Sequence, residues 1–141
     1  MSSVLDRSRS DAVAHRGEQQ AVVALRWRAD DSSHTSWTVT ADGPWGRVCG
    51  RGPDCFEALA RVREQLESAG WLLGVNGARR DTWPSGMGRA TGGLVVCRLV
   101  PGARPTRADL LDTFADAPRE MLATVAEQTL FEHQWTESLH P

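Results

Sequence analysis

The feature that most constrains the fold is an amphipathic helical pattern over residues 54–69. Asp54 stands where an N-cap belongs, and Glu57 follows three residues later, as in a capping box. Gly70 is a typical residue to follow a helix C-terminus. The apolar residues recur at spacings of three and four, which is one face of a helix, and they are Cys55, Leu59, Val62, Leu66 and Ala69. The polar residues expected on the solvent face are Arg61, Arg63, Glu64 and Glu67.

Short segments of alternating polarity precede this helix and are separated by turn residues such as Asp42-Gly43-Pro44. Alternation over four to eight residues is typical of half-buried strands, so we expect a three-stranded antiparallel meander. The segments are residues 21–28, 37–40 and 45–49. Each carries one tryptophan, and we expect these side chains in the core: Trp27, Trp37 and Trp45.

Two dense apolar runs follow the helix, at residues 71–75 and 94–100. Runs of this kind are typical of central strands. Residues 109–114 favour one more strand, although a short helix that begins at Thr106 remains open. A second capping box, formed by Thr124 and Glu127, predicts a helix to the C-terminus. Its apolar stripe would contain Leu130, Phe131, Trp135 and Leu139.

The predicted order is therefore β-β-β-α-β-β-(β)-α, which indicates an α+β fold. We expect a mostly antiparallel sheet of about five to six strands, with two helices packed against it. The first 20 residues are polar and charged with almost no apolar periodicity, which predicts a flexible N-terminal tail. Residues 21–141 then form a single α+β domain.

Composition excludes several classes of function. The formal net charge of -2 disfavours nucleic acid and anionic membrane surfaces as partners. No apolar run approaches the length of a membrane span, and no secretory signal is recognisable. The three cysteines lack a CxxC spacing, so we expect a cytoplasmic protein with reduced thiols. All 16 basic side chains are arginine, which excludes a lysine Schiff base and a Walker-type phosphate loop and suggests a GC-rich bacterial genome.

Between the two apolar runs lies a polar segment rich in arginine and glycine, residues 76–93. Long irregular connections inside small domains are often functional. Guanidinium groups and freed backbone N–H groups bind phosphate or carboxylate. The candidate binding residues are Asn76, Arg79, Arg80, Asp81, Trp83, Ser85, Met87 and Arg89. The structural alternative is that these are turn residues and that Asp81 pairs with Arg79 or Arg80.

The run from Trp71 to Met87 resembles a family of small bacterial proteins of uncharacterised function. That family carries an Asn-Gly-Ala-Arg-Arg-Asp segment followed closely by Pro-Ser-Gly-Met, here residues 76–81 and 84–87. The resemblance covers the middle third of the chain. It implies a shared fold and assigns no activity and no catalytic residue.

The sequence contains no complete catalytic constellation, so we name no catalytic residue, no metal ligand and no cofactor. Asp81 as a base and Ser85 as a nucleophile lack a histidine nearby in sequence. His133 and His140 fall on the last helix without an evident third metal ligand. The sequence therefore favours a non-enzymatic module that binds another protein, of an immunity-like or accessory kind, and a homodimer is compatible with it. The alternative is an enzyme or sensor that binds a phosphate- or carboxylate-bearing small molecule through residues 76–93.

Overall fold

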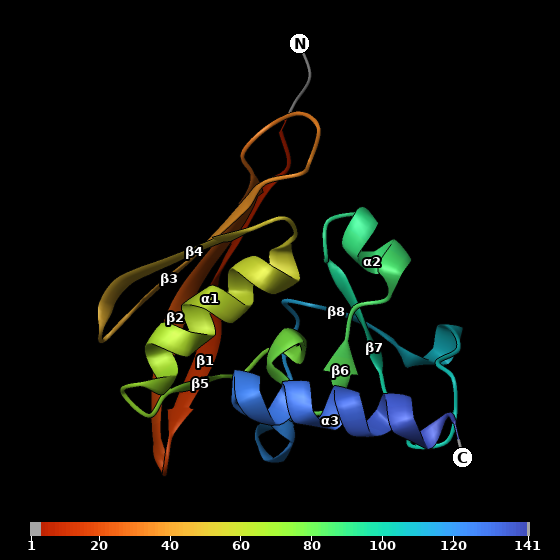
Figure 1. Cartoon of the computed structure of the whole chain (residues 1–141). Coiled ribbons are helices and arrows are strands. Elements are labelled where there is room, and N and C mark those ends of the chain that lie inside the picture. The colour runs from red at the N-terminus through yellow and green to blue at the C-terminus, as the bar shows by residue number, and fades with distance from the viewer. Residues whose placement is uncertain (1–3, 141) are drawn as a thin grey trace.

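A five-stranded antiparallel sheet with one helix across its inner face forms the larger part of the molecule (Figure 1). The computed structural model describes residues 4–140. The strand order is β4-β3-β2-β1-β5. The strands are β1 (Asp6–Arg16), β2 (Gln19–Ala29), β3 (Trp37–Gly43), β4 (Gly46–Gly52) and β5 (Leu72–Leu73), and the helix is α1 (Cys55–Glu67).

A second, three-stranded antiparallel sheet stands beside the first and has the order β6-β7-β8. Its strands are β6 (Thr82–Trp83), β7 (Val95–Arg98) and β8 (Leu110–Asp112). Two further α-helices, α2 (Gly86–Ala90) and α3 (Val125–Ser138), and three 3-10 turns, η1 (Asn76–Ala78), η2 (Arg107–Asp109) and η3 (Arg119–Met121), complete the described chain. The α+β class is confirmed. The described residues form eight strands in two sheets and three α-helices. The sequence had predicted one sheet of about five to six strands and two helices.

The helix predicted over residues 54–69 is confirmed in its position and its N-cap. The Asp54 side chain accepts a hydrogen bond from the Glu57 backbone N–H at 2.9 Å, and Gly70 has the positive φ of 85° expected after a helix. Leu59 and Leu66 are buried against the sheet. The solvent-facing position of Arg63 is wrong, because α3 covers that flank of α1 and leaves the Arg63 side chain only 2% exposed.

The core lies between α1 and the inner face of the five-stranded sheet. Residues 25, 27 and 29 of β2 pair with residues 41, 39 and 37 of β3, so alternate side chains of both strands point at the helix. Trp37 is 1% exposed, Trp27 stacks on Phe114 with ring centroids 4.0 Å apart, and Trp45 meets Trp71 edge-on. The prediction that these strand tryptophans belong to the core is confirmed for Trp37, whereas Trp27 and Trp45 are partly buried and pack against the core.

The flexible tail predicted over residues 1–20 is wrong for the residues that the structure describes. Asp6–Arg16 form β1, which pairs with β2 along its length and with β5 at Ala14 and His15. Ala12 and Ala14 are fully buried, while most of their neighbours are polar and exposed. Small apolar side chains gave too weak an alternation to indicate a strand. Residues 1–3 lie outside the described chain.

The strand predictions after α1 have mixed outcomes. The run at residues 71–75 is not a central strand, because β5 is a two-residue strand at the edge of the larger sheet. The run at residues 94–100 is central, since β7 lies between β6 and β8. The expected strand at residues 109–114 is confirmed as β8, and the turn η2 that begins after Thr106 precedes it.

The C-terminal helix is confirmed with its capping box of Thr124 and Glu127. Its apolar stripe is not a buried core face, because Leu130 is 57% exposed and Gln128 is the residue of α3 that is fully enclosed. The helix therefore docks through a polar side chain. Nothing in a hydrophobic pattern indicates such a contact.

Replacing Leu66 by alanine should lower the free energy of unfolding by about 2–5 kcal/mol, because the change removes buried methyl groups and leaves a cavity. Leu66 is 2% exposed and belongs to the core cluster. Urea unfolding followed by circular dichroism measures the loss. Glu64→Ala on the same helix is the matched control, since Glu64 is exposed, and should change stability by less than about 1 kcal/mol. Equal effects of the two substitutions would contradict the placement of the helix.

Candidate functional site

The polar segment at residues 76–93 is held by contacts within the chain. Arg79 and Asp81 form a two-pronged ion pair, with Nε and Nη2 of the arginine 2.8 and 2.9 Å from the two carboxylate oxygens. Both side chains are nearly enclosed, at 13% and 11% exposed. The structural alternative for this pair is therefore confirmed.

The other two arginines of the segment point to different partners. The Arg80 guanidinium lies over the ring of Phe131 in α3, 5.6 Å from its centroid. Arg89 reaches the start of α1, where its Nη1 lies 3.2 Å from the Asp54 carboxylate and 3.4 Å from that of Glu57. Arg89 also lies over the rings of Phe56 and Trp83. The structure does not bring the three arginines together at one point.

The remaining candidate residues mostly have structural partners as well. Asn76 is buried and donates from its side-chain amide to the backbone oxygen of Asp112 at 3.0 Å. The Ser85 hydroxyl caps α2 by accepting a hydrogen bond from Gly88 N–H at 2.9 Å. Trp83 packs edge-on against Phe56. Met87 differs from them, because its side chain is 79% exposed on α2.

A buried polar network supports the segment from below. Arg63 donates to the backbone oxygens of Gly77 and Ala123 and to Oε1 of Gln128, at 3.1, 2.8 and 2.6 Å. The Gln128 amide then donates to the backbone oxygens of Arg79 and Thr82. Burial lowers the pKa of Arg63 to about 10, so the side chain remains charged at neutral pH. This network joins α1, η1 and α3, and its role is structural.

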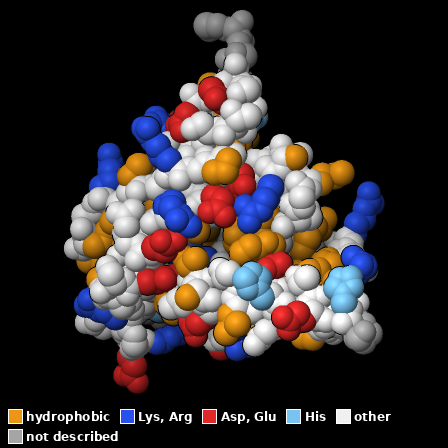
Figure 2. Space-filling view, in the orientation of Figure 1, with side chains coloured by type: hydrophobic (Ala, Val, Ile, Leu, Met, Phe, Trp, Pro, Cys, Tyr) orange, Lys and Arg blue, Asp and Glu red, His pale blue; other side chains and the backbone are white. Residues whose placement is uncertain are grey.

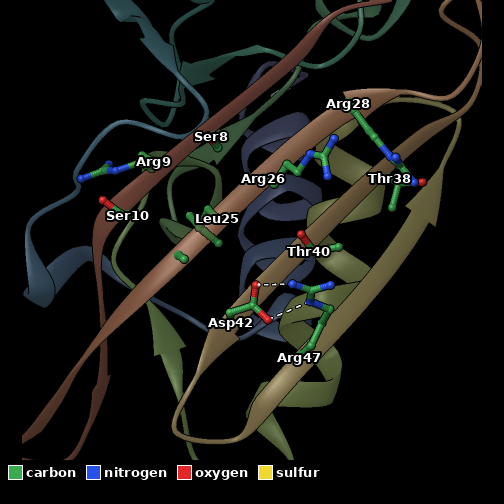
Figure 3. A pocket seen from close by; sticks show the side chains of 11 residues that line it. Ser8, Arg9, Ser10, Leu25, Arg26, Arg28, Thr38, Thr40, Asp42 and Arg47 are labelled. Atoms are coloured by element: carbon green, nitrogen blue, oxygen red, sulfur yellow. Dashed lines mark hydrogen bonds and ion pairs between the residues drawn. The ribbon is translucent and has the colours of Figure 1, made fainter.

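A further candidate surface lies on the opposite side of the larger sheet. We call the face of β1–β4 that points away from α1 the open face. A shallow groove of about 470 Å³ lies on this face, and Figure 3 shows the side chains that line it. Small polar side chains form its floor, and arginines and an aspartate stand around them. The floor residues are Ser8, Ser10, Thr38 and Thr40, and the surrounding residues are Arg26, Arg28, Asp42 and Arg47.

Strand register explains why these side chains gather there. Arg28 of β2 is opposite Thr38 of β3, which is opposite Arg51 of β4, so the two arginines flank one threonine. Successive side chains of a strand point to opposite faces, so residues two positions apart in the same strand lie on the same face. Within residues 4–140, no helix covers the open face, and most of the side chains on it are exposed.

The charges of the open face are mostly paired. Arg26 makes a two-pronged contact with Asp6, and Arg47 makes one with Asp42 at 2.8 and 3.2 Å. The hydrogen bond from Arg26 lowers the pKa of Asp6, because it favours the ionised form of this carboxylate. The contact of Arg28 with Asp30 is longer, at 3.8 Å, and Arg51 has no ion pair among the described residues.

Sequence reasoning did not find the open face. Arg26 and Arg28 alternate in β2, and that alternation was the available signal, but the matching residues of β3 and β4 lie about ten to twenty positions further on. On the side that carries α1 and α3, charged side chains of both signs stand among hydrophobic ones, with no single basic field (Figure 2). The net charge of the chain accordingly says little about either face.

Other kinds of site find little support in the described residues. Among residues 4–140, no group of three or more histidine, cysteine, aspartate or glutamate residues is placed to hold a metal ion. None of the helices in that range is long and apolar enough to cross a membrane. Burial raises the pKa of the Cys55 and Cys97 thiols, which keeps both in their unreactive protonated form.

The fold and the open face together define the chain as a small α+β protein with an uncovered, charged sheet surface. Comparison with known proteins adds no relative to this description. A scan against protein-family models and a search of curated protein sequences both find no match to the chain.

Proposed function

We propose that the protein is a non-enzymatic interaction module that binds another protein through the open face. The observation that carries the proposal is that the outward rows of β1–β4 are left uncovered by the described chain and display ordered charges of both signs. The form that we propose for such a module is an immunity-like or accessory protein of a bacterium.

The chemistry of the open face suits a protein partner. Arginine is enriched at protein interfaces and among the residues that dominate binding energy. Paired charges of alternating sign, such as Arg26 with Asp6 and Arg47 with Asp42, orient a partner with a complementary pattern and exclude others. Arg28 and Arg51 are the least satisfied cations of the face, so we expect carboxylates of the partner to meet them.

The contacts of the polar segment support the non-enzymatic part of the proposal. Asp81 accepts both hydrogen bonds from Arg79, and Ser85 is committed to the cap of α2. Among residues 4–140, neither side chain forms a hydrogen bond with a histidine that could act as a base. The alternative, a phosphate or carboxylate ligand held jointly by Arg79, Arg80 and Arg89, has no supporting observation, because these arginines have separate partners.

The test compares charge-reversed variants in affinity capture from the native host. Arg28→Glu with Arg51→Glu should abolish capture of the partner that the wild-type protein retains, because a carboxylate partner would then face like charges. Arg104→Glu with Arg107→Glu is the matched control, since both arginines are exposed in the connection before β8. Thermal unfolding should show that all variants fold. Retention of the same partner by the open-face variant, or capture of none by the wild type, would contradict the proposal.

A further inference from the structure

A second hollow, on the inner side of the larger sheet, is unlike the open face because its lining is largely apolar. We call it the aromatic cleft. It measures about 410 Å³ and lies where the ends of β1 and β2 pass the second sheet. Its floor and walls are Leu5, Trp27, Leu94 and Phe114, and Arg7, Arg9, Asp112 and Ala115 stand around its mouth.

Phe114 of the aromatic cleft belongs to the core, and the other three apolar residues pack against the core without being fully buried. Trp27 and Phe114 stack face to face, with their planes 8° apart. Leu5, Trp27 and Leu94 are half-buried, so each keeps apolar surface that faces the cleft. Ligand sites are concave and mostly apolar, with a few polar groups that fix orientation, and their volumes begin at about 300 Å³. The aromatic cleft fits this description.

The charges at the mouth of the cleft are not all matched. Arg9 is satisfied by Asp11 at 3.0 Å, by Asp116 at 2.7 Å and by the backbone oxygen of Phe114 at 2.8 Å. Arg7 makes only a 3.4 Å contact with the backbone oxygen of its neighbour Asp6. Within residues 4–140, neither Arg7 nor the Asp112 carboxylate takes part in an ion pair. The mouth therefore offers one unmatched cation and one unmatched anion.

Arg7 is placed to act at the mouth of the cleft by strand register. It lies directly opposite Trp27 in the β1–β2 pair, so both side chains point to the same side of the sheet. Asp112 is the last residue of β8, in the second sheet, and pairs with Val95 of β7. Arg7, Trp27 and Asp112 line the same cleft, so a ligand seated on Trp27 would have a guanidinium and a carboxylate beside it.

We infer that the aromatic cleft binds a free α-amino acid with a large apolar side chain. The side chain packs on Trp27 and Leu94, the α-carboxylate meets Arg7, and the α-ammonium meets Asp112. A zwitterion matches both charges, whereas a simple anion would be repelled by Asp112 and a simple cation by Arg7. Both charged partners are exposed, so the apolar contact supplies most of the affinity, and the dissociation constant is on the order of 1 mM.

The experiment is a titration of the whole ¹⁵N-labelled protein with L-phenylalanine, read from the indole N–H signal of Trp27 in NMR spectra. Two probes each lack one charge, 3-phenylpropionate and 2-phenylethylamine. L-phenylalanine should bind about two- to fivefold more tightly than either, which is the change expected for one exposed ion pair. The Trp27 signal is assigned by its loss in Trp27→Phe.

Two matched variants test the two charged contacts one at a time. Arg7→Gln should weaken L-phenylalanine and 3-phenylpropionate about two- to fivefold and leave 2-phenylethylamine unweakened. Asp112→Asn should weaken L-phenylalanine and 2-phenylethylamine and spare 3-phenylpropionate. Arg104→Gln, in the exposed connection before β8, is the control that changes nothing. The inference is overturned if L-phenylalanine leaves the Trp27 signal unmoved, if a singly charged probe binds as tightly as the amino acid, or if neither variant alters the order of the three probes.

Discussion

Arg63→Ala is expected to lower the free energy of unfolding by about 3–5 kcal/mol, a large part of the stability of a small domain. The Arg63 side chain is 2% exposed, and its guanidinium donates hydrogen bonds to Gly77, Ala123 and Gln128. Alanine would leave these three acceptors buried without their donor and would open a cavity between α1 and α3. We therefore expect the docking of α3 to loosen before the sheet unfolds.

Urea unfolding of Arg63→Ala, followed by far-ultraviolet circular dichroism, measures the loss. Arg61→Ala is the matched control, because Arg61 lies two positions earlier in the same helix and makes its ion pairs with Glu57 and Glu64 at 50% exposure. Exposed pairs contribute about 0–1 kcal/mol, so this control should be nearly as stable as the wild type. A loss below about 1 kcal/mol for Arg63→Ala would contradict the buried network.

The helices could be predicted from the sequence because their signals are local. Asp54 meets the backbone of Glu57, and Thr124 meets that of Glu127, both three residues along the chain. Such contacts form whenever the segment is helical, whatever packs around it. The same holds for Gly70, whose positive φ requires only that the helix ends there.

The burial of Arg63 could not be predicted because its cause is distant in sequence. Helical periodicity places Arg63 off the apolar stripe, where solvent is the default expectation. Its partners are 14 to 65 residues away, on η1 and at the start of α3. A polar side chain enclosed by backbone oxygens from two other segments leaves no hydrophobic signature in any of them.

The first strand was missed for a related reason. Its buried residues Ala12 and Ala14 are small, and the polar residues around them read as an unstructured tail. Pairing with β2 and β5 fixes β1 in the sheet, and such long-range pairing depends on register that a local pattern does not show.

The candidate site shows the same division between local and distant causes. The pairing of Arg79 with Asp81 is local, and the sequence offered it as the structural alternative. The open face depends on residues that are distant in sequence, because Arg28 and Arg51 flank Thr38 only when β2, β3 and β4 are aligned. The sequence therefore indicated a long polar segment between apolar runs and gave no indication of the exposed sheet surface.

Gln128→Leu is expected to lower the free energy of unfolding by about 3 kcal/mol, although it replaces a polar side chain by an apolar one of similar size. The Gln128 side chain is 1% exposed, and its amide donates to backbone oxygens of Gly77, Arg79 and Thr82 at 2.8–3.0 Å. Leucine offers no donor, so acceptors in the polar segment lose their partner. The charged guanidinium of Arg63 also loses its shortest acceptor.

Gln134→Leu on the exposed side of α3 is the control, and it should change stability by less than about 0.5 kcal/mol. The double variant Arg63→Ala with Gln128→Leu tests whether the two side chains act as one unit. Each single change leaves the same neighbouring groups without a hydrogen-bond partner. The double variant should therefore lose less free energy of unfolding than the sum of the two single variants, by about 1–3 kcal/mol. Additive losses would mean that α3 is held by independent contacts and that the network is not a joint support for the polar segment.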